Sequence, residues 1–557
     1  MNKNKLKSFL ACSLITIMSV SSLAGCSTKK PAETKVDKTA KSGPSYSWDK
    51  TPVTLEWFVN FDWYNRKWDV NTLVDKTITD KTGVTVNLQS PGAGGSDKLN
   101  VMIASDQLPD LITTDQWMSQ LGLLQTSGKV EPLLPLIKKE APTFESILPK
   151  SMISWFTQKD GNWNVLPNNY IGKEQMKSNN TYGASQAVLA RKDIMDQLGI
   201  KVSDFDTQDG MIAALKKVDA ANIQYKGKKI IPFYTGPEAG INELFSYILP
   251  GMFGIPRESK DGSYVDRHFD PKNLEMIKFG NRLYTAGFLT KDNFTAQSSQ
   301  IKEKISAGNI FCLAGDKNNF VDSIKQILKS DPKAEYVSVG PVRAKDGAKP
   351  SYGANSTGWL ATMITKSSKN KTRAIRFLEY LYSDEGTAVA NFGVEGKTYT
   401  KDGENDRFKW VDAYKTEIDT NKDAKTKKYN IGEFWLADNT AYKQQHAVAP
   451  SNPVDISWAK TDEFIKPYVF DNTAEQNIAP DAGSDEDIIS TKCFAYYNLQ
   501  VTKALMATDE AAVEKIYNET LKHMKELGID SVTKVMNEKF QANKKKLGIK
   551  FSYPINK

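Results

Sequence analysis

The chain has 557 residues, of which 40% are hydrophobic and 25% are charged, so it can bury several hydrophobic cores and lies far from disordered or collagen-like compositions. Its net charge of +8 is small for this length and no long basic run occurs in the body of the chain, which argues against a nucleic-acid partner bound through its phosphates. The few histidines and cysteines lack metal-ligand spacing and leave almost no material for a zinc site. We therefore expect a globular protein of more than one domain, with no metal and no cofactor.

Residues 1–25 have the pattern of a secretory signal peptide, with a lysine-rich start, an apolar core from Phe9 to about Val20, and small residues before Cys26. The apolar core is too short for a membrane crossing, which needs about 20 apolar residues. The end of the segment, Leu23-Ala24-Gly25-Cys26, resembles the bacterial lipobox, in which the cysteine receives diacylglycerol. An ordinary signal peptide that ends by chance in a cysteine is the alternative. The lipobox predicts an extracytoplasmic protein, anchored to the outer face of the cell membrane through the lipid on Cys26.

Residues 26–48 are expected to form a lipidated, flexible linker, because they contain almost no bulky apolar side chain and cannot build a core. A flexible coil of about 20 residues has a root-mean-square span of roughly 25 Å, which would hold the folded part just above the membrane. Beyond the linker lie Cys312 and Cys493. The sequence leaves open whether these two cysteines form a disulfide or lie apart as buried thiols.

The first folded region alternates strands and helices. Its β-branched and aromatic start, Val53–Phe61, predicts a buried strand, and the pattern continues with strands at 84–89 and 108–114 and helices at 69–82 and 97–105. This order predicts a parallel sheet with crossover helices, in which ligands bind beyond the carboxyl ends of the strands. The rule selects residues that follow the first and the third strand: Asn60, Asp62, Trp63, Tyr64, Asp115 and Trp117.

A second α/β region begins near Trp163. Its expected strands lie at 187–190, 228–237, 309–315, 336–342 and 357–365, and its first expected helices lie at 191–200 and 209–221. Arg191 opens one of these helices, where it can either bind a ligand or pair with Asp193 or Asp196. The tail from about residue 508 to residue 547 has apolar residues at helical spacing and is predicted to be almost wholly helical.

The order of several motifs resembles one known family. The segment Ile364–Gly386 reads as a strand end, a basic loop and an amphipathic helix that closes on a serine-acidic-glutamate-glycine turn. It resembles a signature of the family 1 extracellular solute-binding proteins of bacterial ABC importers. Further weak motifs fall in the order expected for that family: Thr82–Val84, Leu99–Ile112, Lys159–Pro167, Leu189–Ile200 and Phe392–Thr400. The last of them is similar to the large Firmicutes subgroup that binds oligosaccharides, including alginate.

This resemblance implies an α/β, two-lobed, periplasmic-binding-protein-like (type II) fold with a hinge and a ligand cleft between the lobes. By likeness, lobe 1 would comprise residues 49–165 and 336–395, and lobe 2 residues 166–335 and 396–557. The family captures a ligand and delivers it to the transmembrane subunits of an ABC permease. The resemblance therefore implies a monomer that binds an oligosaccharide and catalyses no reaction.

A sugar-binding site needs aromatic side chains against the apolar faces of the rings and short polar groups for the hydroxyls. Aromatic candidates lie at expected strand ends or in polar loops: Trp63, Tyr64, Trp117, Tyr170, Tyr182, Tyr234, Trp359 and Trp435. A single tryptophan at a strand end is more often rim packing, but as a set at least three should contact ligand. The polar candidates are Asn60, Asp62, Asp115, Asn169 and Gln186, whereas Trp57 and Phe58 are expected in the core.

Other activities are less consistent with the residues. Some alginate-binding relatives carry a calcium loop at the position of Asp219–Pro232, but its further carboxylates are missing here, and Asp419–Asp423 lacks the glycine and glutamate of a calcium loop. A secreted glycoside hydrolase or lyase with two catalytic carboxylates remains an alternative, because the spacing of carboxylates in space is not visible in a sequence. A second alternative keeps the fold with a peptide or another small solute as ligand.

Overall fold

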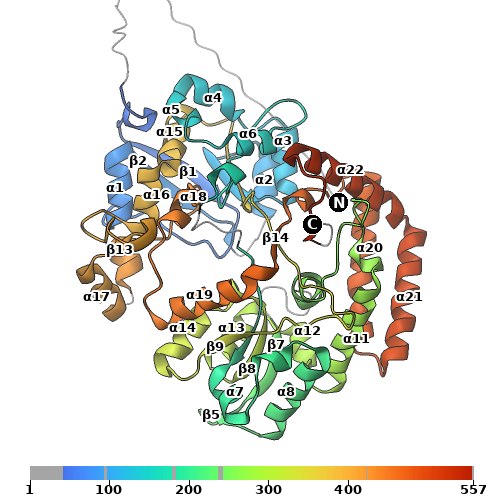
Figure 1. Cartoon of the computed structure of the whole chain (residues 1–557). Coiled ribbons are helices and arrows are strands. Elements are labelled where there is room, and N and C mark those ends of the chain that lie inside the picture. The colour runs from blue at the N-terminus through green and yellow to red at the C-terminus, as the bar shows by residue number, and fades with distance from the viewer. Residues whose placement is uncertain (1–41, 93–96, 178–182, 236–242, 422, 555–557) are drawn as a thin grey trace, which may run out of the picture. The chain divides into compact units, whose positions relative to one another are not determined.

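Two four-stranded sheets organise the residues described by the computed structural model, which are 42–92, 97–177, 183–235, 243–421 and 423–554 (Figure 1). The first sheet has the strand order β11-β3-β1-β2 and the second has the order β7-β8-β4-β9. Each sheet has its own buried core, so the fold consists of two α/β lobes. The predicted signal peptide and lipobox lie in residues 1–41, outside the described residues. The flexible linker expected over residues 26–48 ends earlier than predicted, because Ser45–Ser47 forms a 3₁₀ turn and the backbone N–H of the buried Ser45 donates to Thr143 and Glu379.

The first sheet confirms the parallel arrangement expected from the sequence. Its central strand β1 (Val53–Val59) pairs in parallel with β2 (Val84–Gln89) on one side and with β3 (Leu111–Asp115) on the other. The crossovers carry α1 (Leu73–Thr82) and α2 (Asp97–Ser105). Gly83 ends α1 in the left-handed region at φ 69°, where a Cβ atom would lie 2.2 Å from the carbonyl oxygen of Lys50.

An antiparallel strand, β11 (Leu360–Ile364), completes the first sheet beside β3. Trp57 and Phe58 of β1 are fully buried, as predicted, and the Trp57 indole N–H donates to Thr113 Oγ1 at 2.8 Å. The core also includes the predicted amphipathic helix α15 (Lys371–Tyr382), of which Ala374, Phe377, Leu378 and Leu381 are buried. Because β11 runs opposite to β3, its amino end lies at the same edge of the sheet as the carboxyl ends of β1 and β3.

The second sheet is mixed. Its strand β4 (Gln186–Arg191) is antiparallel to both β8 (Ile310–Asp316) and β9 (Tyr336–Val339), while β7 (Ile231–Thr235) is parallel to β8. Arg191 is 1% exposed and pairs with Asp193. It also donates to the carbonyl oxygen of Gly308. The structure therefore places Arg191 in the packing of the second lobe.

The remaining helices and strands fill both lobes. In the first half of the chain they are α3 (Ser119–Thr126), α4 (Leu133–Glu140), α5 (Pro142–Glu145), α6 (Lys150–Phe156), α7 (Lys192–Leu198), α8 (Gln208–Ala220), β5 (Gln224–Tyr225), β6 (Lys228–Lys229), α10 (Leu249–Met252) and α11 (Pro271–Thr285). Then follow α12 (Lys291–Thr295), α13 (Ser298–Ser306), α14 (Val321–Ser330), β10 (Tyr352–Ala354), α16 (Asp384–Phe392), β12 (Tyr399–Thr400), β13 (Lys409–Trp410), α17 (Asp412–Thr420), α18 (Thr440–Gln445), α19 (Pro453–Ile465), β14 (Val469–Asp471), α20 (Asp485–Leu505), α21 (Glu510–Leu527) and α22 (Ile529–Leu547).

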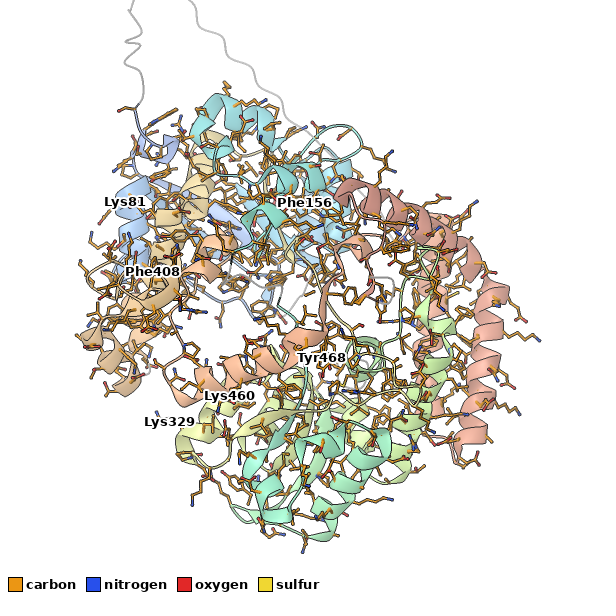
Figure 2. The ribbon with its side chains drawn as sticks, viewed as in Figure 1. Lys81, Phe156, Lys329, Phe408, Lys460 and Tyr468 are labelled. Atoms are coloured by element: carbon orange, nitrogen blue, oxygen red, sulfur yellow. The ribbon has the colours of Figure 1, made fainter. Side chains whose placement is uncertain are left out.

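The lobe boundaries expected after residue 335 are wrong in two places. Residues 336–354 were expected in lobe 1, but β9 pairs with β4, and Tyr352 is buried in the core of the second lobe. Residues 399–437 were expected in lobe 2, but Tyr414 and Phe434 are buried in the core of the first lobe. Figure 2 shows Phe408 on the side of Lys81 and Phe156, away from Lys329 and Tyr468. Both differences arise because the partner of a short strand or loop is far away in the sequence.

The chain passes from one core to the other between three pairs of residues: Tyr170 and Ala184, Ala354 and Leu360, and Ala437 and Ile465. On the side of the second lobe, the segments next to two of these connections are tied together, since β10 pairs in parallel with β14. Segments of this kind are where a hinge can absorb a change of backbone dihedrals.

The helical tail forms two helices rather than one, because Gly528 between α21 and α22 adopts φ 99°. A buried ion pair joins the tail to the second lobe: Lys544 Nζ lies 2.7 Å from Glu258 Oε1. The other carboxylate oxygen accepts hydrogen bonds from the backbone N–H groups of Ser552 and Tyr553, at 2.8 and 2.7 Å. The carboxylate of Glu258 thereby fixes the last residues of the chain that the structure describes.

Cys312 and Cys493, which the sequence left open, are both free and buried. Burial raises the pKa of the Cys312 thiol well above its usual range. Across the described ranges, every helix is either too short or too polar to cross a lipid bilayer.

Candidate ligand-binding site

Four tryptophans form a stacked group at one edge of the first sheet, which we call the tryptophan platform: Trp63, Trp117, Trp359 and Trp435. The rings of Trp63 and Trp435 are nearly parallel, at 13° with centroids 5.9 Å apart. Trp359 stacks on Trp435 at 5.5 Å and on Trp117 at 6.4 Å. Trp63 is 56% exposed and Trp117 is 65% exposed, so much aromatic surface is open to solvent.

The sheet topology explains why residues so far apart in sequence meet here. Trp63 follows β1 and Trp117 follows β3, and the carboxyl ends of these parallel strands lie at one edge. Trp359 immediately precedes β11, whose amino end reaches the same edge because the strand is antiparallel. The backbone N–H of Gln116 donates to the carbonyl oxygen of Trp359 at 2.9 Å and holds the two loops together.

Asn168 and Gly358 position the platform. The side-chain oxygen of Asn168 accepts from the backbone N–H of Leu360 at 3.0 Å, and its amide donates to the carbonyl oxygen of Trp435 at 3.5 Å. Gly358 adopts φ 72°, and a Cβ atom there would lie 1.6 Å from the carbonyl oxygen of Asn168. In the sequence, Asn168 and Asn169 follow the expected end of the first part of lobe 1 at residue 165, whereas nothing in the sequence points to Gly358.

Two buried polar side chains at the same edge carry oxygens without a hydrogen-bond partner among the described residues. Asn60 donates to Thr114 Oγ1 at 3.2 Å, but its own Oδ1 is unpaired, as is Oδ1 of Asp115. Burial raises the pKa of Asp115 to about 6. Unpaired buried oxygens are costly, and a ligand hydroxyl that donates to them would offset the cost.

A cavity of about 660 Å³ adjoins the platform, with Trp63, Tyr64 and Trp435 in its wall. Tyr64 is 7% exposed and its hydroxyl donates to the carbonyl oxygen of Glu433 at 3.3 Å. The other lining residues are polar or charged for the most part: Asn65, Arg66, Lys67, Asp69, Thr72, Thr426, Lys427, Asn430 and Glu433. Asp62 is exposed at the same strand end.

Four further predicted site residues take no part in the ring stacking of the platform: Asn169, Tyr170, Gln186 and Tyr234. Tyr170 is 5% exposed and donates to Ser151 Oγ at 2.6 Å, and Tyr234 is 2% exposed and donates to Asp292 Oδ2 at 2.6 Å. Both hydroxyls therefore serve packing in this conformation. Asn169 is exposed, and Gln186 lines a second cavity in the other lobe. Tyr182 lies outside the described residues.

Within the described ranges, no group of three or more histidine, cysteine, aspartate or glutamate side chains is arranged so that it could hold a metal ion. In the segment Asp219–Pro232, where the sequence lacks the further carboxylates of a calcium loop, Asp219 pairs with Lys229 at 2.8 Å.

Replacing Asp115 by asparagine should increase stability at neutral pH. The pKa of Asp115 is raised from 3.8 to about 6 in the folded state, so the folded protein loses stability as the pH rises from about 4 to about 6. Asp115→Asn removes this loss, and we expect urea unfolding to show a gain of roughly 1–3 kcal/mol at pH 7.5 that shrinks toward pH 4. Asp62→Asn, at an exposed position, should change the unfolding free energy by less than about 0.5 kcal/mol at either pH. An equal effect of Asp115→Asn at pH 4 and pH 7.5 would contradict the assignment.

Residues 71–388 match the family described as bacterial extracellular solute-binding protein. The chain belongs to this family. The match covers more than half of the chain. It includes strands of both sheets, namely β3 and β11 of the first and β8 and β9 of the second. Membership identifies an extracytoplasmic solute-binding protein and supports the resemblance seen in the sequence.

Several known proteins are similar to this solute-binding protein. A carbohydrate ABC transporter substrate-binding protein of Streptococcus pneumoniae serotype 4 is 22% identical over 347 residues. The aligned part is 61% of this chain and 64% of that protein, so this chain spans slightly less than two thirds of the length of that relative. The fructooligosaccharide ABC transporter substrate-binding protein FusA of the same organism is 24% identical over 414 residues, or 70% of this chain and 72% of that protein.

Solved structures show the same fold. FusA in complex with kestose aligns with a TM-score of 0.64 at 16% identity and covers 88% of this chain and 100% of its own. The alginate-binding protein AlgQ2, solved without calcium ion, aligns with a TM-score of 0.59 at 19% identity and covers 88% of this chain and 98% of its own. The solute-binding protein therefore has the two-lobed, periplasmic-binding-protein-like fold that was expected.

Proposed function

We propose that this solute-binding protein captures an oligosaccharide between its two lobes and delivers it to the permease of an ABC importer. The tryptophan platform carries the proposal. Its exposed, roughly parallel indole rings suit the apolar faces of successive sugar units, and the unpaired oxygens of Asn60 and Asp115 suit their hydroxyl groups. The names of the similar proteins, which concern carbohydrates, support the same ligand class.

The proposed mechanism is conformational rather than chemical. The lobes meet through the connecting segments described above, and a ligand favours closure to the extent that it binds the closed state more tightly. From the predicted set we assign ligand contacts to Asn60, Asp62, Trp63, Tyr64, Asp115, Trp117, Trp359 and Trp435 in the first lobe and to Gln186 in the second. Tyr170, Tyr234, Asn169 and Tyr182 remain candidates in the closed state. The protein would act as a monomer, held at the membrane through the lipid on Cys26.

A ligand panel with product analysis tests this function. The test uses the protein without its first 26 residues, since the folded unit begins later, at Gly43. The unfolding temperature of this protein is measured with oligosaccharides and, separately, with peptides. A ligand at 100 times its Kd stabilises the folded state by about 2.7 kcal/mol. We expect one class of oligosaccharide to raise the unfolding temperature by about 3 °C and to be recovered intact by chromatography. A shift with peptides alone would contradict the ligand class, and consumption of the sugar would indicate a hydrolase or lyase instead.

A further inference from the structure

A second cavity, of about 160 Å³, lies in the second lobe beside the connecting strands, and two arginines line it. We call it the arginine pocket and define it by Gln186, Arg257, Arg267, Gly353, Asn472 and Glu475. Gln186 opens β4 opposite Asp316, the last residue of β8. The pocket therefore lies at the edge of the second sheet where β8 ends, the position that corresponds to the tryptophan platform in the first lobe.

The pocket has more positive than negative charge. The only carboxylate among its lining residues is that of Glu475, which lies 3.9 Å from Arg257 Nε. Arg267 donates to the carbonyl oxygen of Ser246 and forms no ion pair with any carboxylate in the described ranges. Burial and the neighbouring charge of Arg257 lower the pKa of Arg267 to about 10, while the charge of Glu475 acts in the opposite direction. An anionic group placed between the guanidinium groups would compensate their positive charge.

The wall of the same pocket also contains acceptors that a carboxylate by itself could not satisfy. Gln186 is 3% exposed, and its Oε1 atom has no hydrogen-bond partner in the part of the chain that the structure describes. The same holds for Oδ1 of Asn472. Such oxygens need donors, which a ligand hydroxyl supplies and a carboxylate does not. Guanidinium donors beside amide acceptors thus match a group that carries both a carboxylate and hydroxyls.

One ligand can reach both sites. Gly353 in the wall of the arginine pocket and Trp359 in the platform are six residues apart, so their Cα atoms are at most about 20 Å apart. A volume of about 160 Å³ admits a small terminal group, while the platform offers space for further units.

On these grounds, and resting on the proposed function, we propose that the ligand is an acidic oligosaccharide. Arg257 and Arg267 bind the carboxylate of one sugar unit, and Gln186 and Asn472 accept hydrogen bonds from the hydroxyls of that unit. Further sugar units stack on the tryptophan platform.

Calorimetry with matched sugar oligomers tests the proposal. The probes are oligomers of galacturonic, glucuronic and mannuronic acid and the neutral oligomers of galactose, glucose and mannose with the same linkages and lengths. We expect at least one uronate to bind ten times or more tighter than its neutral counterpart, and its affinity to fall between 50 and 500 mM salt. Arg267→Gln should weaken uronate binding at least tenfold and neutral-sugar binding by no more than twofold.

Two further variants make the result specific. Arg343→Gln removes the same charge from an exposed position and should leave both affinities unchanged. Arg257→Gln, whose side chain is 31% exposed, provides a second test if Arg267→Gln fails to fold. Neutral oligomers that bind as tightly as uronates, or variants that weaken both classes equally, would overturn the acidic ligand and leave the proposed function intact. Absence of binding by every saccharide in the panel would overturn both.

Discussion

Replacing Trp63 by alanine should weaken oligosaccharide binding about 30-fold and leave the fold stable. The indole of Trp63 is 56% exposed even though Phe61, Trp359 and Trp435 stack on it, so more than half of its surface is open to a sugar ring. Covering roughly 80 Å² of apolar surface contributes about 2 kcal/mol, which corresponds to a factor of about 30 in Kd. Calorimetry with the oligosaccharide that gives the largest thermal shift measures this loss directly.

A second tryptophan and a control define the outcome. Trp117→Ala removes the other exposed ring of the platform and should weaken binding by a similar factor. Trp155→Ala removes a half-buried tryptophan of α6 that takes no part in the platform, so Kd should stay unchanged even if the unfolding temperature falls. The platform would lose its assigned role if Trp63→Ala and Trp117→Ala bound the sugar as tightly as the unmodified protein.

Lys544→Met should destabilise the protein by about 3–5 kcal/mol, because it leaves the carboxylate of Glu258 buried without its cation. Glu258 is 1% exposed and Lys544 is 5% exposed, and Lys544 also donates to the carbonyl oxygen of Gly262 at 2.7 Å. Urea unfolding measures the change in free energy. The double variant Glu258→Gln/Lys544→Met should be more stable than Lys544→Met, since the buried charge is then absent.

Lys545→Met provides the comparison for this effect. Lys545 is the neighbouring residue on α22 but is exposed, so its replacement should change the unfolding free energy by less than about 0.5 kcal/mol. Equal effects of the substitutions at 544 and 545 would show that the buried ion pair does not stabilise the attachment of the tail.

Much of the first lobe could be predicted from local sequence. The strand at 84–89 and the helix at 97–105 have the expected bounds, and the parallel pairing of β1 with β2 and β3 follows from their alternation with helices. The strand-end rule then placed Trp63, Asp115 and Trp117 at one edge. Side chains that follow parallel strands converge because the backbone fixes where each strand ends.

Other parts of the prediction failed for non-local reasons. Tyr170 and Tyr234 have the same sequence context as the platform tryptophans, yet both are buried with their hydroxyls paired to Ser151 and Asp292. Of the arginine pocket, only Gln186 was predicted from the sequence, because Arg257 and Arg267 come near Glu475 only through contacts that span more than 200 residues.

The sequence by itself determined the family, the two α/β regions and the edge of the first sheet at which aromatic side chains gather, because hydrophobic periodicity and chain order are local properties. Only the tertiary structure decided which sheet each later strand joins, which aromatic rings remain exposed, and which charged groups lack a partner. Those outcomes depend on contacts between residues that are distant in the chain, and a strand with the pattern of β9 is equally compatible with either sheet until its hydrogen bonds to β4 are formed.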